Sequence, residues 1–279
     1  MAAQSGTQAT NQELWTTIFR DGHPALKSFQ RFHSWLPSSP RCKMCYAPFH
    51  GVGGIYMRLR GKGPANRNPR YCSACDKFLR AFPGGAEVAM SMMFVDVRGS
   101  VQIAERMAPA GFSQFLQGFF ASATQALIDT DGFVVDFRGD CVVGVYPPGF
   151  SGADHARKAV EAARHLLNDI PPLAPDGALV PIGIGIHTGL VFIGTVSGAE
   201  SGMHDITILG HNVNIAARLS QSAGAGEALI SEEAVAASRL ELGALEVREL
   251  ELKGKSTLTA ARVLRSAANS TKATAARLH

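Results

Sequence analysis

The stretch from Phe133 to Tyr146 reads FVVDFRGDCVVGVY, two short apolar arms that are divided at Arg138 and Gly139. Runs rich in β-branched and aromatic residues that are interrupted by a glycine predict two strands joined by a tight hairpin. The residue after the glycine is Asp140, so a carboxylate is expected at the tip of this hairpin. An isolated aspartate at such a place is most often a turn residue, and only its neighbours in the fold can give it another role.

A second carboxylate, that of Asp96, lies near the end of an apolar run from Met90 to Val97, which is suited to a buried strand. The chain continues through Gly99 and Ser100 into a helical pattern, and the first turn of a helix presents free amide groups that can bind phosphates. Two aspartates at strand ends could converge at one edge of a sheet. Their carboxylate oxygens are the ligands that Mg²⁺ prefers. A site for metal ions and phosphates is therefore expected there.

The pattern between residues 86 and 265 alternates between strands and helices. Helices are expected over residues 112–127, 153–170 and 212–222, and strands over 180–187, 190–195, 204–209, 246–253 and 257–264. This order predicts an α+β domain whose antiparallel or mixed sheet carries its helices on one face.

Asn214 and Arg218 are four residues apart within the last of these helices, so they lie on the same helix face. An arginine remains protonated and donates two parallel hydrogen bonds, which suits the negative charge that builds on a phosphate in a transition state. Taken alone, such a pair is most often part of a solvated helix face. Its place after the two aspartates makes a functional role the stronger interpretation.

Asp96, Asp140, Asn214 and Arg218, with the residues that flank them, resemble the active site of the class III nucleotidyl cyclases over residues 88–264. The resemblance implies a ferredoxin-like class III nucleotidyl cyclase fold that converts a nucleoside triphosphate to a 3′,5′-cyclic monophosphate and pyrophosphate. In this family the two aspartates bind two Mg²⁺ or Mn²⁺ ions, and the next carbonyl, here that of Val97, adds a ligand. Asn214 would orient the ribose and Arg218 would stabilise the transition state, both from the other protomer of a homodimer.

The chain departs from the family at a position that reads the base. Adenine-specific members carry a lysine four residues before the second metal-binding aspartate, where this chain has Asp136. The other base-reading position is Thr207, a replacement that is also seen in bacterial adenylate cyclases. The family lysine that meets the distal phosphates corresponds to Lys253, with Lys255 as the alternative.

Asp136 leaves two hypotheses open. An ionised carboxylate only accepts hydrogen bonds; guanine offers donors at N1 and N2, whereas N1 of adenine is an acceptor. The pocket would then be relaxed or lean toward guanine, with ATP or GTP as the substrate. Under the second hypothesis, the domain has lost efficient turnover and acts as a nucleotide-responsive dimerisation module.

Four of the five cysteines form two pairs near the start of the chain, Cys42-x-x-Cys45 and Cys72-x-x-Cys75, with 26 residues between the pairs. In a chain without a secretion signal, this spacing predicts a metal site like that of a zinc ribbon rather than disulfides. Structural Zn²⁺ is expected, with iron or an iron–sulfur cluster as the alternative. Four protein ligands leave no open position for catalysis.

The first part of the chain is also strongly basic. Residues 1–80 hold 12 Lys and Arg against 3 Asp and Glu, whereas the remainder holds 15 against 20. The basic loop between the cysteine pairs could bind nucleic acid, with Tyr56 and Tyr71 available for stacking on bases. A solvated loop that offsets the charge of the metal centre, or one that docks on the acidic half, is the preferred interpretation.

These patterns predict four segments. An N-terminal helical and partly disordered segment covers 1–37, a small metal-stabilised four-cysteine module like a zinc ribbon covers 38–82, the cyclase-like domain covers 86–265, and a disordered tail covers 266–279. With 46% apolar and 18% charged residues, the composition is that of a globular protein. No apolar run is long enough to span a bilayer and the first residues lack a signal-peptide pattern, so a cytoplasmic protein without a membrane partner is expected.

Overall fold

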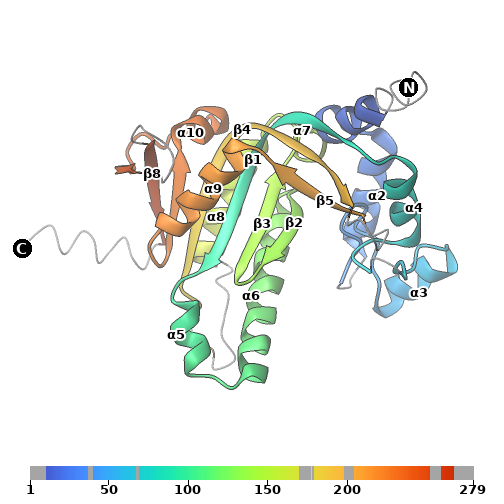
Figure 1. The fold of residues 1–279 in the computed structure, drawn as a ribbon, viewed down its shortest axis with the longest axis horizontal. Coiled ribbons are helices and arrows are strands. Elements are labelled where there is room, and N and C mark those ends of the chain that lie inside the picture. Colours follow the sequence, from blue (N-terminus) through green and yellow to red (C-terminus); the bar gives the residue numbers. More distant parts are fainter. Residues whose placement is uncertain are drawn as a thin grey trace, which may run out of the picture. The chain divides into compact units, whose positions relative to one another are not determined.

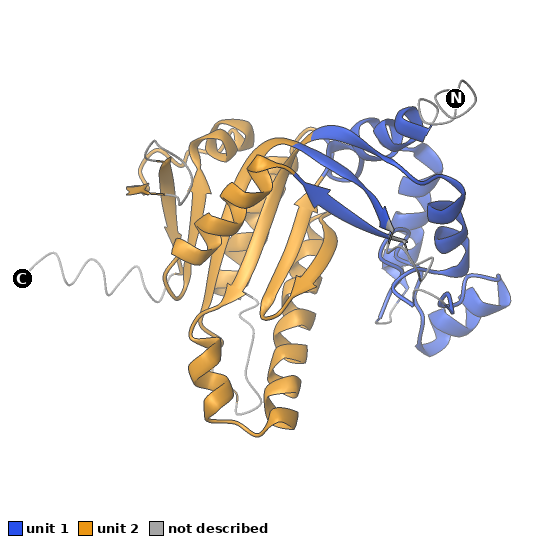
Figure 2. Ribbon diagram, viewed as in Figure 1, with its two compact units in different colours: residues 1–88, 147–152, 191–209 blue, residues 89–146, 153–190, 210–279 orange. Residues whose placement is uncertain are grey.

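The computed structural model describes residues 11–36, 40–66, 69–169, 177, 179–197, 204–251 and 259–266. The chain forms two compact units, shown in the same view in Figures 1 and 2. Unit 1 consists of residues 1–88, 147–152 and 191–209, and unit 2 consists of residues 89–146, 153–190 and 210–279. Each unit is therefore assembled from segments that are far apart in the sequence.

The described residues form one mixed sheet of eight strands. The strands are β1 (Gly85–Val97), β2 (Phe133–Arg138), β3 (Cys141–Tyr146), β4 (Ile182–Ser197), β5 (His204–Leu209), β6 (Glu227–Ser231), β7 (Glu246–Leu250) and β8 (Thr259–Arg265). Their order is β2-β3-β1-β4-β6-β8-β7, with β5 paired to β4. β6 runs parallel to β4, while β3 is antiparallel to both β1 and β2. The hairpin expected at residues 133–146 is confirmed.

The main core of unit 2 lies between the sheet and the helices α6 (Pro109–Asp129) and α8 (His155–Arg164). Phe115 and Phe119 of α6 pack in one buried cluster with Val142 of β3 and Ile184 of β4. Burial of each large apolar side chain contributes about 1.5–3 kcal/mol. This packing holds the central strands in place, and two of them carry the candidate active-site aspartates at their ends.

A further helix, α9 (His211–Ser222), covers the opposite face of the sheet. Successive side chains on a strand point to opposite faces. On β6, Ala228 and Ile230 belong to the main core, whereas Leu229 packs with Ile215 and Leu219 of α9 in a second cluster. The expectation that all helices lie on one face is therefore wrong. Because β6 carries apolar side chains on both faces, each face needs a cover.

Shorter helices complete unit 2, and helices form most of unit 1. Unit 2 also contains α5 (Ser100–Glu105), the π-helical turn His165–Asp169 and α10 (Glu232–Ser238). In unit 1, helical residues 11–16 continue into the π-helical turn Thr17–Asp21, followed by α2 (Pro24–Trp35), α3 (Gly51–Leu59), α4 (Ser73–Ala81) and α7 (Pro148–Ser151). The buried Trp15 stacks on Phe19, with 5.4 Å between ring centroids, and its indole donates a 3.0 Å hydrogen bond to the Phe82 carbonyl.

Two features of the sheet differ from the sequence expectation. β4 is one continuous strand, although two separate strands, over residues 180–187 and 190–195, were expected. A Cβ on Gly189 would lie 2.5 Å from the Asn212 side chain, so this glycine permits a close approach rather than a turn. β6 and α10 were not predicted, because segments of five and seven residues are too short to show a clear period. No helix among the described residues combines the length and the hydropathy needed to cross a bilayer.

Candidate active site and metal centre

Asp96 and Asp140 meet where β1 ends beside the β2–β3 hairpin. Asp96 pairs across the ladder with Cys141, and the Val97 amide donates a 3.3 Å hydrogen bond to the Asp140 carbonyl. In the two-residue turn before β3, Gly139 has a φ of 63°, a left-handed conformation that glycine adopts without steric cost. The local geometry therefore places the two carboxylates beside each other.

The electrostatics of this pair favour a bound cation. Burial raises the pKa of the Asp96 carboxyl above its usual value, and Asp140 raises it further, while Arg98 opposes both effects. Two partly buried carboxylates that repel each other form a donor set that suits a hard divalent ion. Burial, followed by the charges of Asp96 and Asp140, raises the pKa of the Cys141 thiol to about 12, so this thiol is neutral near pH 7.

Arg98 is a residue of this site that sequence reasoning missed. Its Nη2 atom contacts the Asp96 carboxylate, and its Nη1 atom donates a 3.0 Å hydrogen bond to the Gln221 carbonyl near the end of α9. A Cβ on Gly183 of β4 would lie 2.9 Å from Arg98 Nε, so the glycine leaves room for the guanidinium. Arg98 therefore links a candidate metal ligand to α9. The one sequence signal was its place two residues after Asp96.

Asn214 and Arg218 both lie on α9, as the sequence pattern indicates. A Cβ on Gly185 of β4 would come within 2.4 Å of the Ala216 carbonyl oxygen, so a glycine is required for α9 to pack this closely. Asn214 is exposed and Arg218 is half-buried. Among the described residues, no hydrogen bond or ion pair connects Asn214 or Arg218 to the two aspartates. Within the same residues, the Arg218 guanidinium has no hydrogen-bond or ion-pair partner. Within this one chain, the four residues are not joined.

The start of α9 is held by a chain of hydrogen bonds through the buried His187 of β4. The Asn212 amide donates a 2.8 Å hydrogen bond to the Leu190 carbonyl, and its Oδ1 lies 3.0 Å from His187 Nε2. His187 Nδ1 lies 2.8 Å from the Ser231 hydroxyl, which also accepts the Ala234 amide hydrogen and caps α10. Since Oδ1 can only accept, Nε2 carries the proton and Ser231 donates to Nδ1. His187 thus supports α9 as a packed, hydrogen-bonded histidine.

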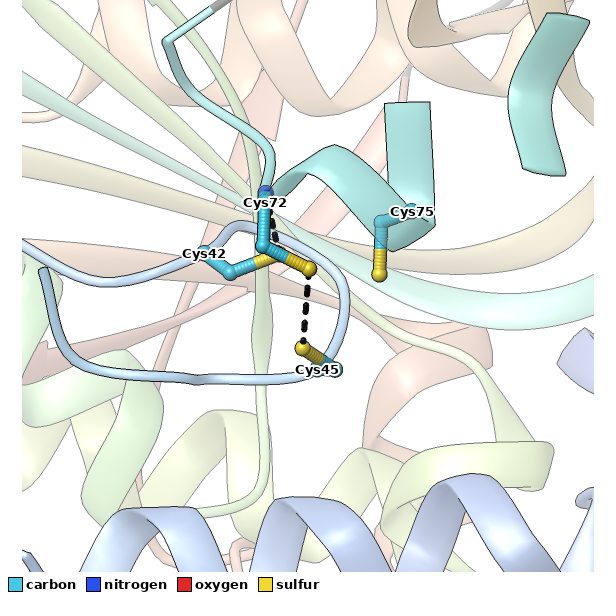
Figure 3. A group of neighbouring side chains, drawn as sticks. All are labelled: Cys42, Cys45, Cys72 and Cys75. Carbon is cyan, nitrogen blue, oxygen red and sulfur yellow. Dashed lines mark hydrogen bonds between the residues drawn. The ribbon is translucent and has the colours of Figure 1, made fainter. Parts of the chain in front are cut away.

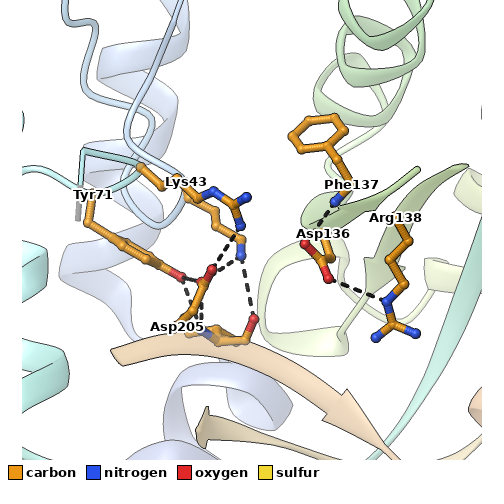
Figure 4. A network of polar contacts seen from close by, with 8 residues as sticks. Lys43, Tyr71, Asp136, Phe137, Arg138 and Asp205 are labelled. Atoms are coloured by element: carbon orange, nitrogen blue, oxygen red, sulfur yellow. Dashed lines mark hydrogen bonds and ion pairs between the residues drawn. The ribbon is translucent and has the colours of Figure 1, made fainter. Parts of the chain in front are cut away.

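The two base-reading candidates lie on different strands. Asp136 of β2 accepts a 2.9 Å hydrogen bond from the Phe137 amide and a 3.3 Å one from Arg138 Nε (Figure 4). Thr207 lies on β5, opposite Gly194 of β4. Asp136 belongs to unit 2 and Thr207 to unit 1, so each is described within its own unit.

The candidate phosphate-binding residues are only partly described. Gly99 has a φ of 68° and is the N-cap of α5, and Ser100 is the first residue of that helix. This is the turn into a helix that the sequence predicted after Asp96. Lys253 lies outside the described residues.

Residues 86–263 match the family model of the adenylate and guanylate cyclase catalytic domain. The chain belongs to this family. The match covers the strand that carries Asp96, the hairpin with Asp140, and α9 with Asn214 and Arg218. The cyclase domain therefore takes in all of unit 2 that is described up to residue 263 and the parts of unit 1 that follow residue 85.

Comparison with known proteins finds both adenylate and guanylate cyclases. An adenylate cyclase of Anabaena cylindrica is 32% identical over 134 residues, which are 47% of this chain and 26% of that protein. The guanylyl cyclase Cya2 aligns with a TM-score of 0.58 at 21% identity, covering 66% of this chain and 95% of that one. The adenylyl cyclase CyaB from P. aeruginosa aligns with a TM-score of 0.54 at 24% identity, covering 66% and 97%. The structural likenesses show the cyclase fold, and the chain spans well under two thirds of the curated relatives' length.

The four paired cysteines lie before the cyclase domain and form one cluster in unit 1 (Figure 3). Their sulfur atoms all lie within 4.8 Å of one another, and those of Cys45 and Cys72 are 3.7 Å apart. Tetrahedral Zn²⁺ with bonds of about 2.3 Å to sulfur needs sulfur atoms about 3.8 Å apart, so the cluster fits this ion. Hydrogen bonds from Cys42, Cys45 and Cys75 lower the pKa of the Cys72 thiol, which favours a thiolate in the cluster.

Polar side chains of α2 hold one of the cysteine loops from outside. The Gln30 amide donates a 2.9 Å hydrogen bond to the Met44 carbonyl, and His33 Nδ1 lies 2.6 Å from the Cys45 carbonyl. Burial lowers the pKa of His33, so its ring is neutral and donates through Nδ1. Fixing the carbonyls of a ligand loop orients the ligands themselves.

Residues next to the cysteines bind Asp205, on strand β5 of the cyclase domain (Figure 4). Lys43 Nζ lies 2.8 Å from Asp205 Oδ1, Arg70 Nη1 lies 2.9 Å from Oδ2, and the Tyr71 hydroxyl donates a 2.6 Å hydrogen bond to Oδ1. Burial alone would raise the pKa of Asp205, but Lys43, Tyr71 and Arg70 together hold it below its usual value. Sequence reasoning missed this cluster, because Asp205 belongs to no motif. The four-cysteine module and β5 are thus joined within unit 1.

Proposed function

We propose that this chain is a nucleotidyl cyclase that converts a purine nucleoside triphosphate, ATP or GTP, to the 3′,5′-cyclic monophosphate and pyrophosphate in signal transduction. The observation that carries the proposal is the apposition of the Asp96 and Asp140 carboxylates within a segment that matches the cyclase family. Ring closure requires the ribose 3′-oxygen to attack the α-phosphorus while pyrophosphate leaves in line. Positioning and charge stabilisation are what the protein must supply.

Asp96, Asp140 and the Val97 carbonyl would hold two Mg²⁺ or Mn²⁺ ions, whose oxygen-ligand preference fits this donor set. Bound ions would lower the pKa of the ribose hydroxyl and screen the triphosphate. Arg98 donates to Asp96 and opposes the rise of its pKa, which favours the ionised carboxylate that a metal ion would need. The amides of Gly99 and Ser100 would face the phosphates.

Asn214 and Arg218 would act across a homodimer interface. Asn214 would orient the ribose, Arg218 would stabilise the charge on the α-phosphate, and Lys253 would meet the distal phosphates. Support comes from their shared face on α9 and from the absence, among the described residues, of a partner for the Arg218 guanidinium. In this proposal a single chain carries only half of each active site.

Asp136 and Thr207 would read the base. The Asp136 carboxylate accepts hydrogen bonds from the Phe137 amide and from Arg138. A carboxylate acceptor suits the N1 and N2 donors of guanine better than it suits adenine, whose N1 is itself an acceptor. We therefore propose a relaxed pocket or one that leans toward GTP.

The cluster of four cysteines would hold one structural Zn²⁺, with iron as the alternative metal. Four buried thiols need a reducing compartment to remain free for a metal, which supports a location in the cytoplasm. We propose residues 38–82 as this module and residues 86–265 as the catalytic domain.

Two alternatives rest on particular residues. Asp136 in place of the family lysine favours a cyclase-like regulatory or dimerisation module with little turnover. The basic loop between the cysteine pairs favours nucleic-acid binding. Tyr71, however, was expected to be available for stacking on bases, and it is buried and hydrogen-bonded to Asp205. The second alternative is weakened by this contact.

The test is product formation from ATP and GTP, each with Mg²⁺ and Mn²⁺, by the full-length protein and by Asp140→Ala. We expect cyclic product from the wild type and a loss of about a hundredfold or more in the variant, because one metal ligand is removed. No product from a folded, zinc-loaded dimer that still binds nucleotide would instead identify a regulatory module.

A further inference from the structure

Helix α2 buries two polar side chains and exposes its three aromatic ones. Gln30 and His33 are buried against the Met44 and Cys45 carbonyls, and His33 is only 2% exposed. Phe29, Phe32 and Trp35 are all exposed, Trp35 by 81%. A surface helix of a water-soluble protein normally shows the reverse arrangement. Packing within this chain therefore does not explain the apolar side chains on the outer face of α2.

Helix α3 presents a second row of exposed apolar side chains. Val52 and Leu59 are 84% and 82% exposed, and Ile55 is exposed as well. The inner face of α3 consists of Gly53, Gly54 and Met57. A Cβ on Gly54 would lie 2.4 Å from the Phe49 backbone, so α3 is pressed against its own chain on that side. Its apolar row faces away from this contact.

The two helices lie next to each other in unit 1. Lys62, just after α3, places its Nζ 4.0 Å from the centre of the Phe29 ring of α2. Leu36, just after α2, lies 3.4 Å from where a Cβ on Gly53 would be. The end of α2 thus approaches the start of α3, and Lys62, which follows α3, reaches the middle of α2. We refer to their exposed apolar residues together as the α2–α3 surface: Phe29, Phe32, Trp35, Val52, Ile55 and Leu59.

Basic residues surround the α2–α3 surface and acidic residues are missing from this part of the sequence. Between Asp21 and Asp76 the sequence has no Asp or Glu. It has nine Lys and Arg in the same stretch: Lys27, Arg31, Arg41, Lys43, Arg58, Arg60, Lys62, Arg67 and Arg70. Of these, Lys27, Arg31, Arg58 and Arg60 are exposed on or beside the two helices.

We propose that the α2–α3 surface docks on an anionic lipid bilayer. Apolar and aromatic side chains enter the boundary between headgroups and acyl chains, while Lys and Arg bind lipid phosphates. A second copy of this chain on the same surface would bring like charges together. A nucleic acid offers no apolar surface that would bury the aliphatic side chains of Val52, Ile55 and Leu59. Side chains that project from two helices enter a deformable bilayer without the matching pockets that a protein partner would need.

This proposal goes beyond cyclase activity and does not depend on it. No membrane partner was expected from the sequence, because no segment is long enough to span a bilayer. That reasoning does not apply to helices that lie in the interface, where the signal is an exposed apolar face beside basic residues. A peripheral cyclase would make its cyclic nucleotide at the membrane surface.

Trp35 offers a direct readout of docking. The chain has two tryptophans, and the other, Trp15, is fully buried. Purified full-length protein is mixed with vesicles of phosphatidylcholine alone or of phosphatidylcholine with phosphatidylglycerol. We expect co-sedimentation and a blue shift of tryptophan emission with the anionic vesicles only, and both are expected to weaken with salt. In Trp35→Phe the blue shift is expected to disappear.

Matched variants separate the apolar and the charge contributions. Val52→Ser with Leu59→Ser, and Arg31→Gln with Arg60→Gln, should each weaken binding to anionic vesicles roughly tenfold or more. Val247→Ser removes an exposed apolar side chain from β7 of unit 2 and should leave binding unchanged. Unchanged metal content in each variant shows that the four-cysteine module remains folded.

Several outcomes would overturn the proposal. These are absence of vesicle binding, equal binding to neutral and anionic vesicles, and variants that bind like the wild type. A change of oligomeric state in the variants without vesicle binding would show that the surface joins two copies. Binding to an acidic polypeptide but not to vesicles would show a protein partner. Asp140→Ala should bind vesicles normally whether or not the wild type is an active cyclase, so the two proposals fail separately.

Discussion

The hydroxyl of Tyr71 donates a 2.6 Å hydrogen bond to Asp205, which lies 134 residues further along the chain. Burial, followed by the charge of Asp205, raises the pKa of Tyr71 well above its usual value, so the phenol remains a donor near neutral pH. Tyr71 directly precedes Cys72, and the strand of Asp205 runs directly into Gly210 and α9. The four-cysteine module therefore holds a strand that leads to candidate catalytic residues.

Replacing Asp205 should destabilise unit 1. In Asp205→Asn the Lys43 ammonium, whose side chain is only 9% exposed, loses its charged partner, and Tyr71 loses a charged acceptor. We expect the free energy of unfolding to fall by about 1–3 kcal/mol in denaturant titrations. Arg70→Ala removes a more exposed partner of the same carboxylate and should cost about 1 kcal/mol or less.

The pH dependence checks the cause of this loss. The folded-state pKa of Asp205 is lowered, so its contribution to stability is present above the unfolded-state pKa and is lost as the pH falls through the folded-state pKa. The difference in the free energy of unfolding between the wild type and Asp205→Asn should therefore become smaller as the pH is lowered into the acid range. A difference that stays constant down to the lowest accessible pH would contradict the assignment.

Loss of the metal from the four-cysteine module should lower cyclase activity, although no cysteine of the cluster belongs to the catalytic set. In Cys72→Ser the loops that carry Lys43, Arg70 and Tyr71 would lose the metal proposed to order them, and their hold on β5 would weaken. We expect about one metal ion per chain in the wild type, much less in the variant, and a lower kcat. Cys141→Ser changes the fifth cysteine and should retain the metal. Full cyclase activity in metal-free protein would show that catalysis does not depend on the four-cysteine module.

Much of the cyclase domain was predictable, because its signals are local. The apolar arms on either side of Gly139, the helical spacing of Asn214 and Arg218, and the two cysteine pairs each need only a few consecutive residues. The close placement of Asp96 and Asp140 followed from one further step, the assumption that two strand ends meet at one edge.

The remaining features depend on contacts between distant segments. Arg98 reaches the end of α9 across β4, and Asp205 is bound by residues more than 130 positions earlier, so no local pattern marks them. Two strands were expected on either side of Gly189, because the side chain that occupies the space of its missing Cβ, that of Asn212, comes from another element. A helical segment was expected where α2 lies, but the sequence could not show that His33 and Gln30 form its buried face.

Asp96→Asn should stabilise the protein while it abolishes activity. The raised pKa of Asp96 means that its ionised form is disfavoured in the fold near neutral pH, and this cost disappears as the pH falls through the raised pKa. A neutral amide removes the cost at every pH. We expect Tm to rise by about 2 °C in buffer without Mg²⁺ or Mn²⁺, a typical trade between stability and function.

Added Mn²⁺ distinguishes this explanation from a general effect of the substitution. The wild type should gain Tm with Mn²⁺, because the ion binds the folded state, and Asp96→Asn should gain little. Asp140→Asn is the matched control, since it removes the repulsion from the other side of the pair. A lower Tm for Asp96→Asn without metal would show that the bond to Arg98 outweighs burial.

Asp136→Lys should shift turnover toward ATP. A lysine donates to adenine N1, whereas the present carboxylate only accepts. Gain of one good hydrogen bond to the base predicts a rise of roughly tenfold in the ratio of kcat/KM for ATP to that for GTP. Asp136→Asn, which removes the charge without adding a long donor, should change the ratio less. An unchanged ratio in Asp136→Lys would remove the base-reading role from this position.

Asn212 should act on catalysis through the placement of α9. Its side chain connects Leu190 and His187 of β4 to the turn of α9 that precedes Asn214 and Arg218. In Asn212→Ala we expect kcat to fall roughly tenfold, because small displacements of catalytic groups are costly, while the free energy of unfolding falls by about 1 kcal/mol. Ser231→Ala breaks the other hydrogen bond of His187 and the cap of α10, at a similar cost in stability. The Ser231 hydroxyl hydrogen-bonds His187 and the Ala234 amide rather than a residue of α9, so its loss should leave kcat nearly unchanged. Equal losses of kcat in both variants would mean that stability, and not the position of α9, sets the rate.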